Sequence, residues 1–391
     1  MMTEFLGYVR PDGSVGIRNY VMLLSGTLYA NKLCDHLSNH VPNTVSITHP
    51  LIRCQVPPDL RMSCKILSNT AMNPNIAAVV VVDHFREEGC TAEDIAHRIQ
   101  TETGKPVATV NIRGESGYVN AYAQALRYAS SYARMVSDFR REPVPVSNLL
   151  MGVECGTSDT TSGLASNPAT GYCADKIIDA GGRTILAEAT EWMGCEHWLT
   201  SRAASDQVAD QIVAAVKDIE RRAMESGEDI RGSQPTGDNM AGGLTTIEEK
   251  SMGAVKKGGT REIVGYLGLA DRPDETPGLY LMYGPGHGGE SISSMAAAGC
   301  QVLVFSTGGG HTSAHPIMPT IKVTGNVHSA QLMKDTVELD ISDILQGNMT
   351  IEDAGEMIFD EVIATANGRL TKSETFKDGN SFAMHRVGIS V

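Results

Sequence analysis

IAAVVVVDH, residues 76–84, is the stretch that decides the fold. A continuous apolar run ends at Asp83 and His84. Such a run is typical of a strand buried on both faces, as in a parallel sheet that helices cover on both sides. The segments around it alternate in the same way: strands are predicted at 19–26, 44–50 and 106–112, and helices at 30–41, 91–104 and 118–139. This alternation predicts a doubly wound α/β unit.

A second unit of the same kind follows a short segment with two prolines, REPVPVS at 141–147, which we interpret as a linker. Strands are predicted at 149–155, 183–189, 278–284 and 300–306, and helices at 166–180 and 205–225. The polar, Gly/Pro-rich stretch 226–243 is predicted to be a loop, long enough to suggest a function. The sequence therefore predicts two open α/β domains with mostly parallel sheets, at 1–140 and 148–391.

The composition fits a globular protein and excludes several classes of function. The 391 residues carry a net charge of −14 and 41% hydrophobic residues. An acidic chain without a Lys/Arg cluster is a poor candidate for binding nucleic acid or an anionic membrane. No apolar run approaches the roughly 18 to 20 residues of a membrane span, and the start of the chain has no signal-like apolar segment. The eight scattered cysteines lack any CxxC, so we expect free thiols and a cytoplasmic location.

Four polar clusters follow predicted strands. They are VECGTSD (153–159), AEATEWMGCEHW (187–198), GPGHGGES (284–291) and STGGGHTSAHP (306–316). Ligands of open α/β sheets bind at the carboxyl ends of strands. Together the clusters supply carboxylates, imidazoles and a thiol, which is the ligand set of a divalent transition metal.

Each cluster has an alternative reading. Glu188 and Glu191 have the spacing of a solvated helix start, and VECGTSD also fits a polar turn or a nucleophile site at Cys155. His311 and His315 have the i, i+4 spacing of a metal pair, but the glycines and Pro316 argue against a helix there. GGGHTS lacks the lysine of a phosphate-binding loop, which disfavours nucleotide binding.

The N-terminal stretch GYVRPDGSVGIRNYV, residues 7–21, places Arg18 and Asn19 at the start of a predicted strand. An arginine fork binds a carboxylate through two parallel hydrogen bonds, so this pair is a candidate substrate clamp. The alternative is that Arg18 pairs with an acid of the protein itself.

Several long motifs resemble the altronate/galactarate dehydratase family. They are GYVRPDGSVGIRN (7–19), ECGTSDTTSGLASNPATG (154–171), EATEWMGCEH (188–197), AGGLTTIEEKSMG (241–253), STGGGHTSAHPIMPTIKVTGN (306–326) and NGRLTKSE (367–374). The resemblance covers nearly the whole chain. It implies a metal-dependent lyase that uses Fe²⁺ or Mn²⁺, with Mg²⁺ as a further candidate, and removes water from a sugar acid.

The resemblance also implies partners. Larger members of the family carry an additional small N-terminal domain, and this chain is similar to the large subunit of a split enzyme. We therefore expect a separate small subunit of about 100 residues, the size of a small domain, and a homo-oligomer. The large subunit of sulfolactate sulfo-lyase, a relative that expels sulfite, has the same arrangement.

Two departures from the family pattern bear on the substrate. A glycine-rich THGTGCG-like stretch is replaced by THPLIRC at 48–54, and a TGRG-like loop by TGGGH, which introduces Gly309 and His311. We expect both changes near the substrate, where they favour a different leaving group or a shorter acid.

The chemistry implied by the family is a β-elimination that yields a 2-keto acid. A proton leaves the carbon next to the carboxylate, and a bound metal stabilises the anion that forms. The candidate residues fall into three groups. For catalysis they are His287, His311, Glu191 and Lys250; for substrate binding Arg18, Asn19, Ser158, Ser162, Asn167, Asn239 and Lys322; and for the metal Glu154, Cys155, Asp159 and Glu188. Two alternatives stay open: release of sulfite and pyruvate from (2R)-sulfolactate, and a non-catalytic homologue that binds an acid or another subunit.

Overall fold

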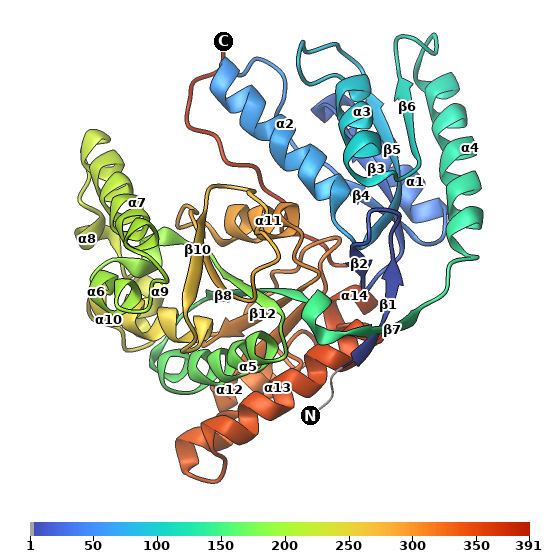
Figure 1. The fold of residues 1–391 in the computed structure, drawn as a ribbon. Helices are drawn as coiled ribbons and strands as arrows, with labels where there is room; N and C mark the ends of the chain where they lie inside the picture. Colours follow the sequence, from blue (N-terminus) through green and yellow to red (C-terminus); the bar gives the residue numbers. More distant parts are fainter. Residues whose placement is uncertain (1–3) are drawn as a thin grey trace.

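The computed structural model describes residues 4–391 and contains two parallel sheets and a small antiparallel one (Figure 1). The first three residues, which belong to the predicted N-terminal domain, lie outside the described part. The predicted fold class, α/β with mostly parallel sheets, is confirmed.

The first parallel sheet has the strand order β4-β3-β5-β6. Its strands are β3 (Tyr20–Ser25), β4 (Thr44–Ile47), β5 (Ile76–Asp83) and β6 (Val107–Asn111). Helices α1 (Asn31–His40) and α4 (Tyr118–Val136) pack on one face, and α2 (Pro57–Met72) and α3 (Ala92–Thr103) on the other. Because both faces are covered, every residue of β5 is buried, as its apolar run predicts.

The second parallel sheet has seven strands in the order β10-β11-β9-β8-β12-β13-β14. They are β8 (Leu150–Gly156), β9 (Arg183–Leu186), β10 (Ile263–Leu267), β11 (Gly278–Met282), β12 (Val302–Thr307), β13 (Thr320–Thr324) and β14 (Leu339–Asp340). The chain leaves β8 toward β9 and later returns to β12 on the other side of β8. A crevice at such a reversal, at the carboxyl ends of the strands, is the usual ligand site of open sheets.

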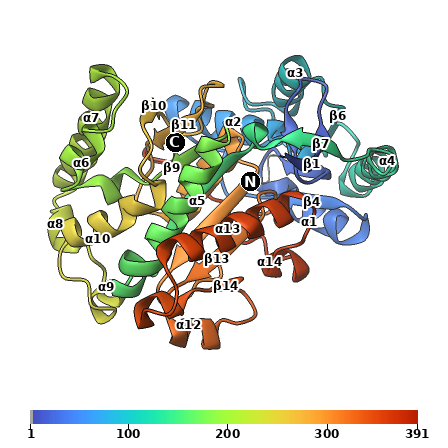
Figure 2. The same cartoon turned by 60° about the horizontal axis from the view of Figure 1, so that its bottom comes forward.

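Helices cover both faces of this second sheet. The core on one face includes residues of α5 (Asn167–Asp179), α7 (Asp206–Glu225) and α13 (Ile351–Ala366), which Figure 2 labels. Helix α11 (Gly288–Ala298), labelled in Figure 1, packs on the other face. The remaining short helices are α6 (Glu196–Thr200), α8 (Ile230–Ser233), α9 (Gly237–Ala241), α10 (Ile247–Ala254), α12 (Val327–Leu332) and α14 (Lys372–Thr375). The predicted loop 226–243 therefore contains two short helices, α8 and α9.

The segment predicted as a linker, 141–147, connects the two parallel sheets and is itself partly a strand. β7 (Glu142–Pro145) pairs with β1 (Glu4–Val9), which also pairs with β2 (Val15–Gly16). The division into domains at this segment stays a proposal.

The C-terminal residues return to the first sheet and join the two halves. They follow α14 and run past α11 and α2 to the C-terminus (Figure 1). The backbone N–H of Val391 donates to the carbonyl of Cys54 at 3.0 Å, and that of Gly388 donates to the Asp59 carboxylate at 2.7 Å. We call residues 376–391 the C-terminal tail. None of the helices within residues 4–391 combines the length and the apolar character that crossing a membrane requires.

Candidate active site

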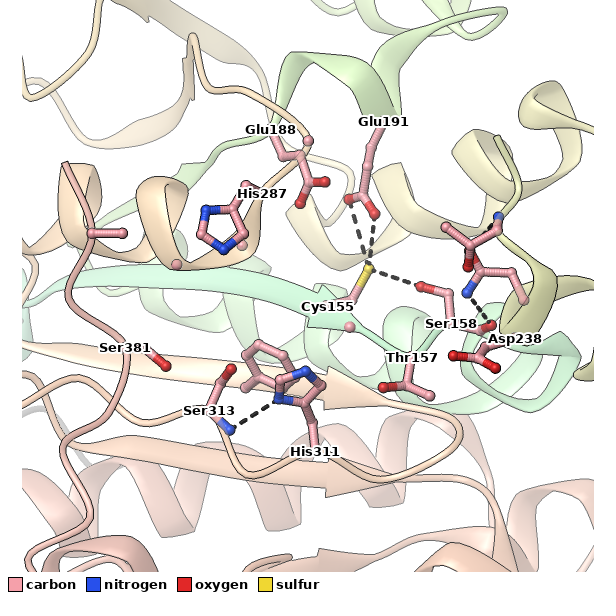
Figure 3. A pocket seen from close by; sticks show the side chains of 18 of the residues that line it. Cys155, Thr157, Ser158, Glu188, Glu191, Asp238, His287, His311, Ser313 and Ser381 are labelled. Carbon is pink, nitrogen blue, oxygen red and sulfur yellow. Dashed lines mark hydrogen bonds between the residues drawn. The ribbon is translucent and has the colours of Figure 1, made fainter. Parts of the chain in front are cut away.

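Loops that follow four parallel strands of the second sheet meet around one cavity of about 380 Å³. Cys155 is the penultimate residue of β8, Glu188 and Glu191 follow β9, His287 follows β11, and His311 follows β12. Figure 3 shows these side chains from separate loops around the same space. The lining of the cavity also includes Thr157, Ser158, Gln234, Thr236, Asp238, Asn239, Lys250, Phe305, Ser313, Asn380, Ser381 and Phe382. The four polar clusters of the sequence thus converge at one edge of the sheet.

Three buried carboxylates form a group of which two, Glu188 and Glu191, line this cavity, while Glu154 lies outside its lining. Glu154, Glu188 and Glu191 each offer an oxygen within 4.8 Å of the others. Neither carboxylate oxygen of Glu154 has a hydrogen-bond partner within residues 4–391, and its side chain is fully buried. Buried polar atoms are nearly always paired, so an unpartnered carboxylate points to a missing ligand. The oxygen donors and their spacing fit a divalent cation.

Glu188 has a strained backbone at this position. Its φ is +68°, in the left-handed region that residues other than glycine rarely adopt. Gly284, after β11, allows the close approach, because a Cβ there would lie 3.1 Å from the Glu188 nitrogen. Such strain is typical of functional positions that the surrounding structure holds in place.

Lys257 supplies a positive charge next to the carboxylate group. Its fully buried ammonium group forms an ion pair with Glu191 and lies 3.3 Å from the Cys155 sulfur. The thiol of Cys155 in turn donates to Glu191 at 3.2 Å. Burial, and next the negative charge of Glu191, raise the pKa of Cys155 to about 12. Cys155 therefore holds a proton at neutral pH and lies outside the group of three carboxylates.

The ionisation of the three carboxylates differs because only one has a direct cationic partner. Burial, and next the charge of Glu188, raise the pKa of Glu154 well above its usual range. Burial and the charge of Glu191 also raise the pKa of Glu188. Burial opposes ionisation of Glu191 as well, but the charges of Lys257 and Lys250 outweigh it and lower its pKa. One carboxylate is thus held ionised, while the other two lack a direct cationic partner.

The two candidate histidines differ in their surroundings. His287 precedes α11, and 68% of its side chain is exposed. His311 lies against Phe305, and its Nδ1 accepts a hydrogen bond from the backbone N–H of Ser313 at 2.9 Å. Burial, and next the charge of Lys322, lower the pKa of His311. Its Nε2 therefore carries the proton of a neutral ring.

Several predicted site residues hold loops instead of lining the cavity. Asp159 accepts hydrogen bonds from the Ser162 backbone N–H at 2.8 Å and from the Asn326 side chain at 3.0 Å. The Ser162 hydroxyl donates to the Asp159 carbonyl, and Asn167 donates to the Gly253 carbonyl at 3.1 Å. Asp159 is also outside the carboxylate group. Ser158 and Asn239 do line the cavity, and Asn239 donates to the Ser158 carbonyl at 2.9 Å.

Three residues predicted to bind substrate, Arg18, Asn19 and Lys322, lie elsewhere. All five N–H groups of Arg18 are engaged, two with the Glu374 carboxylate and three with backbone carbonyls, so no donor remains for a substrate. Asn19 donates to the Val136 carbonyl and accepts from Arg10. Lys322 is fully buried and donates to the Ser373 hydroxyl at 2.6 Å. None of the three lines the cavity.

The two departures from the family pattern have different positions. None of residues 48–54 lines the cavity, and His49 is buried, where it contacts the Ser25 carbonyl at 2.7 Å. In the second loop, His311 lines the cavity but His315 does not. Burial lowers the pKa of His315 to about 3.

Lys257 and the C-terminal tail are parts of the site that the sequence reasoning missed. Lys257 stands four residues after the quoted motif AGGLTTIEEKSMG, in AVKKGG, and a lysine pair before glycines is a signal of little specificity. The tail contributes Asn380 to Ala383 to the cavity wall from the far end of the chain, where no motif marks them.

Comparisons with known proteins cover nearly the whole chain. Residues 146–390 match the family model described as D-galactarate/altronate dehydratase, C-terminal. Residues 7–137 match that of D-galactarate dehydratase/altronate hydrolase, second domain.

Individual relatives match over similar lengths. Subunit beta of (2R)-sulfolactate sulfo-lyase from Chromohalobacter salexigens is 36% identical over 95% of this chain and 94% of the relative. Altronate dehydratase from Escherichia coli is 28% identical over 98% of this chain and 78% of the relative. Galactarate dehydratase (L-threo-forming) from the same species is 27% identical over 96% of this chain and 74% of the relative.

Proposed function

The chain belongs to the D-galactarate/altronate dehydratase family, and from this premise we propose that it is a metal-dependent lyase. The reaction is a β-elimination from a 2-hydroxy acid, in which the α-proton and a group on the next carbon leave and a 2-keto acid results. The observation that carries the proposal is the group of three buried carboxylates, in which Glu154 is unpartnered and Glu188 and Glu191 line a polar cavity.

Glu154, Glu188 and Glu191 are the residues that hold the metal in this proposal. When bound, a divalent ion such as Fe²⁺ or Mn²⁺ acts as a Lewis acid that stabilises the developing negative charge of the substrate. Lys257 keeps Glu191 ionised through their ion pair. Lys250, which also faces the cavity, adds a positive charge for the substrate carboxylate.

The two histidines take different roles. His287 is exposed to the cavity and accepts the α-proton, a positioned base being worth about 10² to 10⁴-fold in rate. His311 is neutral, with its Nδ1 occupied by Ser313, so it donates a hydrogen bond from Nε2 and orients the substrate. Hydroxyl and amide groups of Ser158 and Asn239 hold the hydroxyls of the acid.

A sugar acid such as altronate or galactarate is the first candidate substrate. The names of two relatives support it, and so does a lining rich in hydroxyl, amide and carboxylate groups, which suits a polyhydroxy acid. The enzyme is then a hydro-lyase that forms a 2-keto-3-deoxy acid.

(2R)-Sulfolactate is the second candidate, and the relative at 36% identity favours it because the two chains match over nearly their full lengths. The enzyme is then a carbon–sulfur lyase that releases sulfite and pyruvate. Since that relative is named subunit beta, we include a small partner subunit in the proposal.

The test is an assay of the chain, alone and together with a candidate small subunit, with altronate, galactarate and sulfolactate in the presence of Fe²⁺ or Mn²⁺. Water elimination yields a 2-keto acid without sulfite, and the sulfo-lyase reaction yields both pyruvate and sulfite. Metal binding without product from any of the acids would contradict the lyase and leave the non-catalytic homologue as the explanation.

A further inference from the structure

We propose that Glu290 and His385 are positioning residues for His287, so that the C-terminal tail is a working part of the site. The proposal rests on the proposed function, in which His287 accepts the α-proton. The three side chains form a chain of contacts from the cavity to the tail: His287, Glu290, His385.

Helix α11 places the first two members side by side. His287 is the N-cap residue, and Glu290 lies in the first turn, where its backbone N–H donates to the His287 carbonyl at 2.9 Å. The His287 Nδ1 and a Glu290 carboxylate oxygen are 3.8 Å apart. Contacts of catalytic groups are often long before substrate binds and then shorten.

The tail supplies the third member. His385 Nδ1 lies 2.9 Å from the other Glu290 oxygen, and this is the only polar contact of its ring within residues 4–391. Its Nε2 is buried without a partner. A carboxylate only accepts hydrogen bonds, so His385 donates from Nδ1. A largely buried imidazole whose single partner is Glu290 fixes the direction of that carboxylate.

The tail is itself held in place on both sides of His385. The backbone N–H of Ala383 donates to the Ser293 hydroxyl at 2.9 Å, and that of Gly388 donates to Asp59 at 2.7 Å. His385 therefore lies on a segment that is tied to α11 and to α2.

This arrangement selects the useful tautomer of His287. A hydrogen bond from Nδ1–H to Glu290 leaves the lone pair on Nε2, which takes the α-proton, while the electron pair of the C–H bond forms the double bond and the leaving group departs with its own electrons. The carboxylate also stabilises the imidazolium that results. The other titratable groups of the cavity are Cys155, Glu188, Glu191, Asp238, Lys250 and His311.

The test compares steady-state kinetics of four variants. Glu290→Gln keeps the shape and removes the charge, and we expect kcat to fall about 10- to 100-fold, as for removal of partners that orient ligating histidines, with KM little changed. His385→Ala should also lower kcat. His385→Asn should restore it, because its amide N–H takes the place of Nδ1–H. His328→Ala, at an exposed site on α12, is the control.

Wild-type kcat in Glu290→Gln, or equal losses in His385→Ala and His385→Asn, would overturn the positioning roles. Nitrogen-15 NMR of labelled histidines separates this failure from failure of the proposed function, because it needs no turnover. We expect His287 as the Nδ1–H tautomer in the wild-type protein and a mixture in Glu290→Gln. The same tautomer mixture in both proteins would contradict the proposal even if the enzyme is active.

Discussion

Two buried charged clusters in this molecule are built in opposite ways. At the junction of the two halves, Arg18 is 5% exposed and every N–H of its guanidinium has an acceptor. At the candidate active site, Glu154 is equally buried, yet neither carboxylate oxygen has a partner within the described residues. The first cluster is complete without a ligand, and the second is not.

The difference separates stabilisation from function. A buried ion pair with all its hydrogen bonds made contributes to holding segments together, and Arg18 joins the start of β3 to α14 through Glu374. Unpaired buried carboxylates cost stability unless a cation compensates them. The comparison therefore predicts opposite effects when each cluster is mutated.

The largest effect is expected at Glu154. Glu154→Gln keeps the volume and removes one ligand charge, so kcat/KM should fall about 10³-fold, which corresponds to the several kcal/mol that a metal supplies. The free energy of unfolding of the metal-free protein should stay equal or rise, because a neutral amide replaces a buried carboxyl group whose raised pKa disfavours its ionised form in the folded protein. Enzyme assay and urea denaturation of the metal-free protein measure the two quantities. As a control, Glu225→Gln, on the exposed face of α7, should change neither kcat/KM nor the free energy of unfolding. Full activity of Glu154→Gln would contradict the distinction between the two clusters.

The next effect is expected at Arg18. Arg18→Met leaves the Glu374 carboxylate without its cation, although the Tyr20 hydroxyl and the Thr371 backbone N–H still donate to it. The free energy of unfolding should therefore fall by about 3 kcal/mol, the low end for a broken buried pair. The exposed pair of Arg221 with Glu225 provides the control, and Arg221→Met should cost less than about 1 kcal/mol. Metal binding by Arg18→Met at a temperature where it stays folded should equal that of the wild type. Equal stability of Arg18→Met and Arg221→Met would contradict the role of Arg18 in stabilising the junction.

A smaller effect should follow removal of Lys257. Lys257→Met takes away the partner of Glu191, and we expect a loss of roughly 2 kcal/mol for a hydrogen bond between charged groups. Mn²⁺ should recover much of this stability, because the ion supplies the missing positive charge to Glu191. Thermal melting of the variant with and without Mn²⁺ measures this. Mn²⁺ should raise the melting temperature of Lys257→Met more than that of Glu154→Gln. Equal rises in the two variants would argue against a metal site shared by Glu154 and Glu191.

The smallest effect concerns pH at the junction. Burial opposes ionisation of Glu374, but the hydrogen bonds and charge of Arg18 outweigh it and lower the pKa of Glu374. A lowered pKa gives stability that is present above the unfolded pKa of about 4.3 and is lost as pH falls through the folded value. The difference in melting temperature between wild type and Glu374→Gln should therefore be constant near pH 6 to 7 and shrink below about pH 4. A difference that grows on acidification would contradict the ion pair.

Much of the fold follows from local patterns. The helix predicted at 91–104 is α3, with a capping box between Thr91 and Asp94 and with Gly104 in the left-handed conformation at its end. The unbroken apolar run of β5 reports burial on both faces. Helix α2 was not predicted, because its apolar face is interrupted by buried polar residues such as Ser63, Asn69 and Thr70.

The candidate site was predictable as far as strand ends determine it. Glu188, Glu191, His287 and His311 lie together because parallel strands end at one edge of the sheet. Whether a polar residue faces the cavity or caps its own loop depends on side-chain direction, and sequence spacing does not contain that information. Asp159 is an example: it follows β8, the strand that contains Cys155, but its side chain accepts a hydrogen bond from the backbone of its own turn.

Contacts between distant segments were the hardest to predict. Arg18 and Glu374 are 356 positions apart, and His385 of the tail contacts Glu290 across 95 positions. No periodicity reports such contacts, so Arg18 was assigned to the substrate when its partner is an acid of the protein, the alternative that the sequence had left open.

Direct measurement of bound metal tests the central claim. Isothermal titration of the metal-free protein with Mn²⁺ should give one ion per chain in the wild type and in Arg18→Met, and no binding at that site in Glu154→Gln. Absence of Mn²⁺ and Fe²⁺ binding by the wild type, or unchanged binding by Glu154→Gln, would contradict the account.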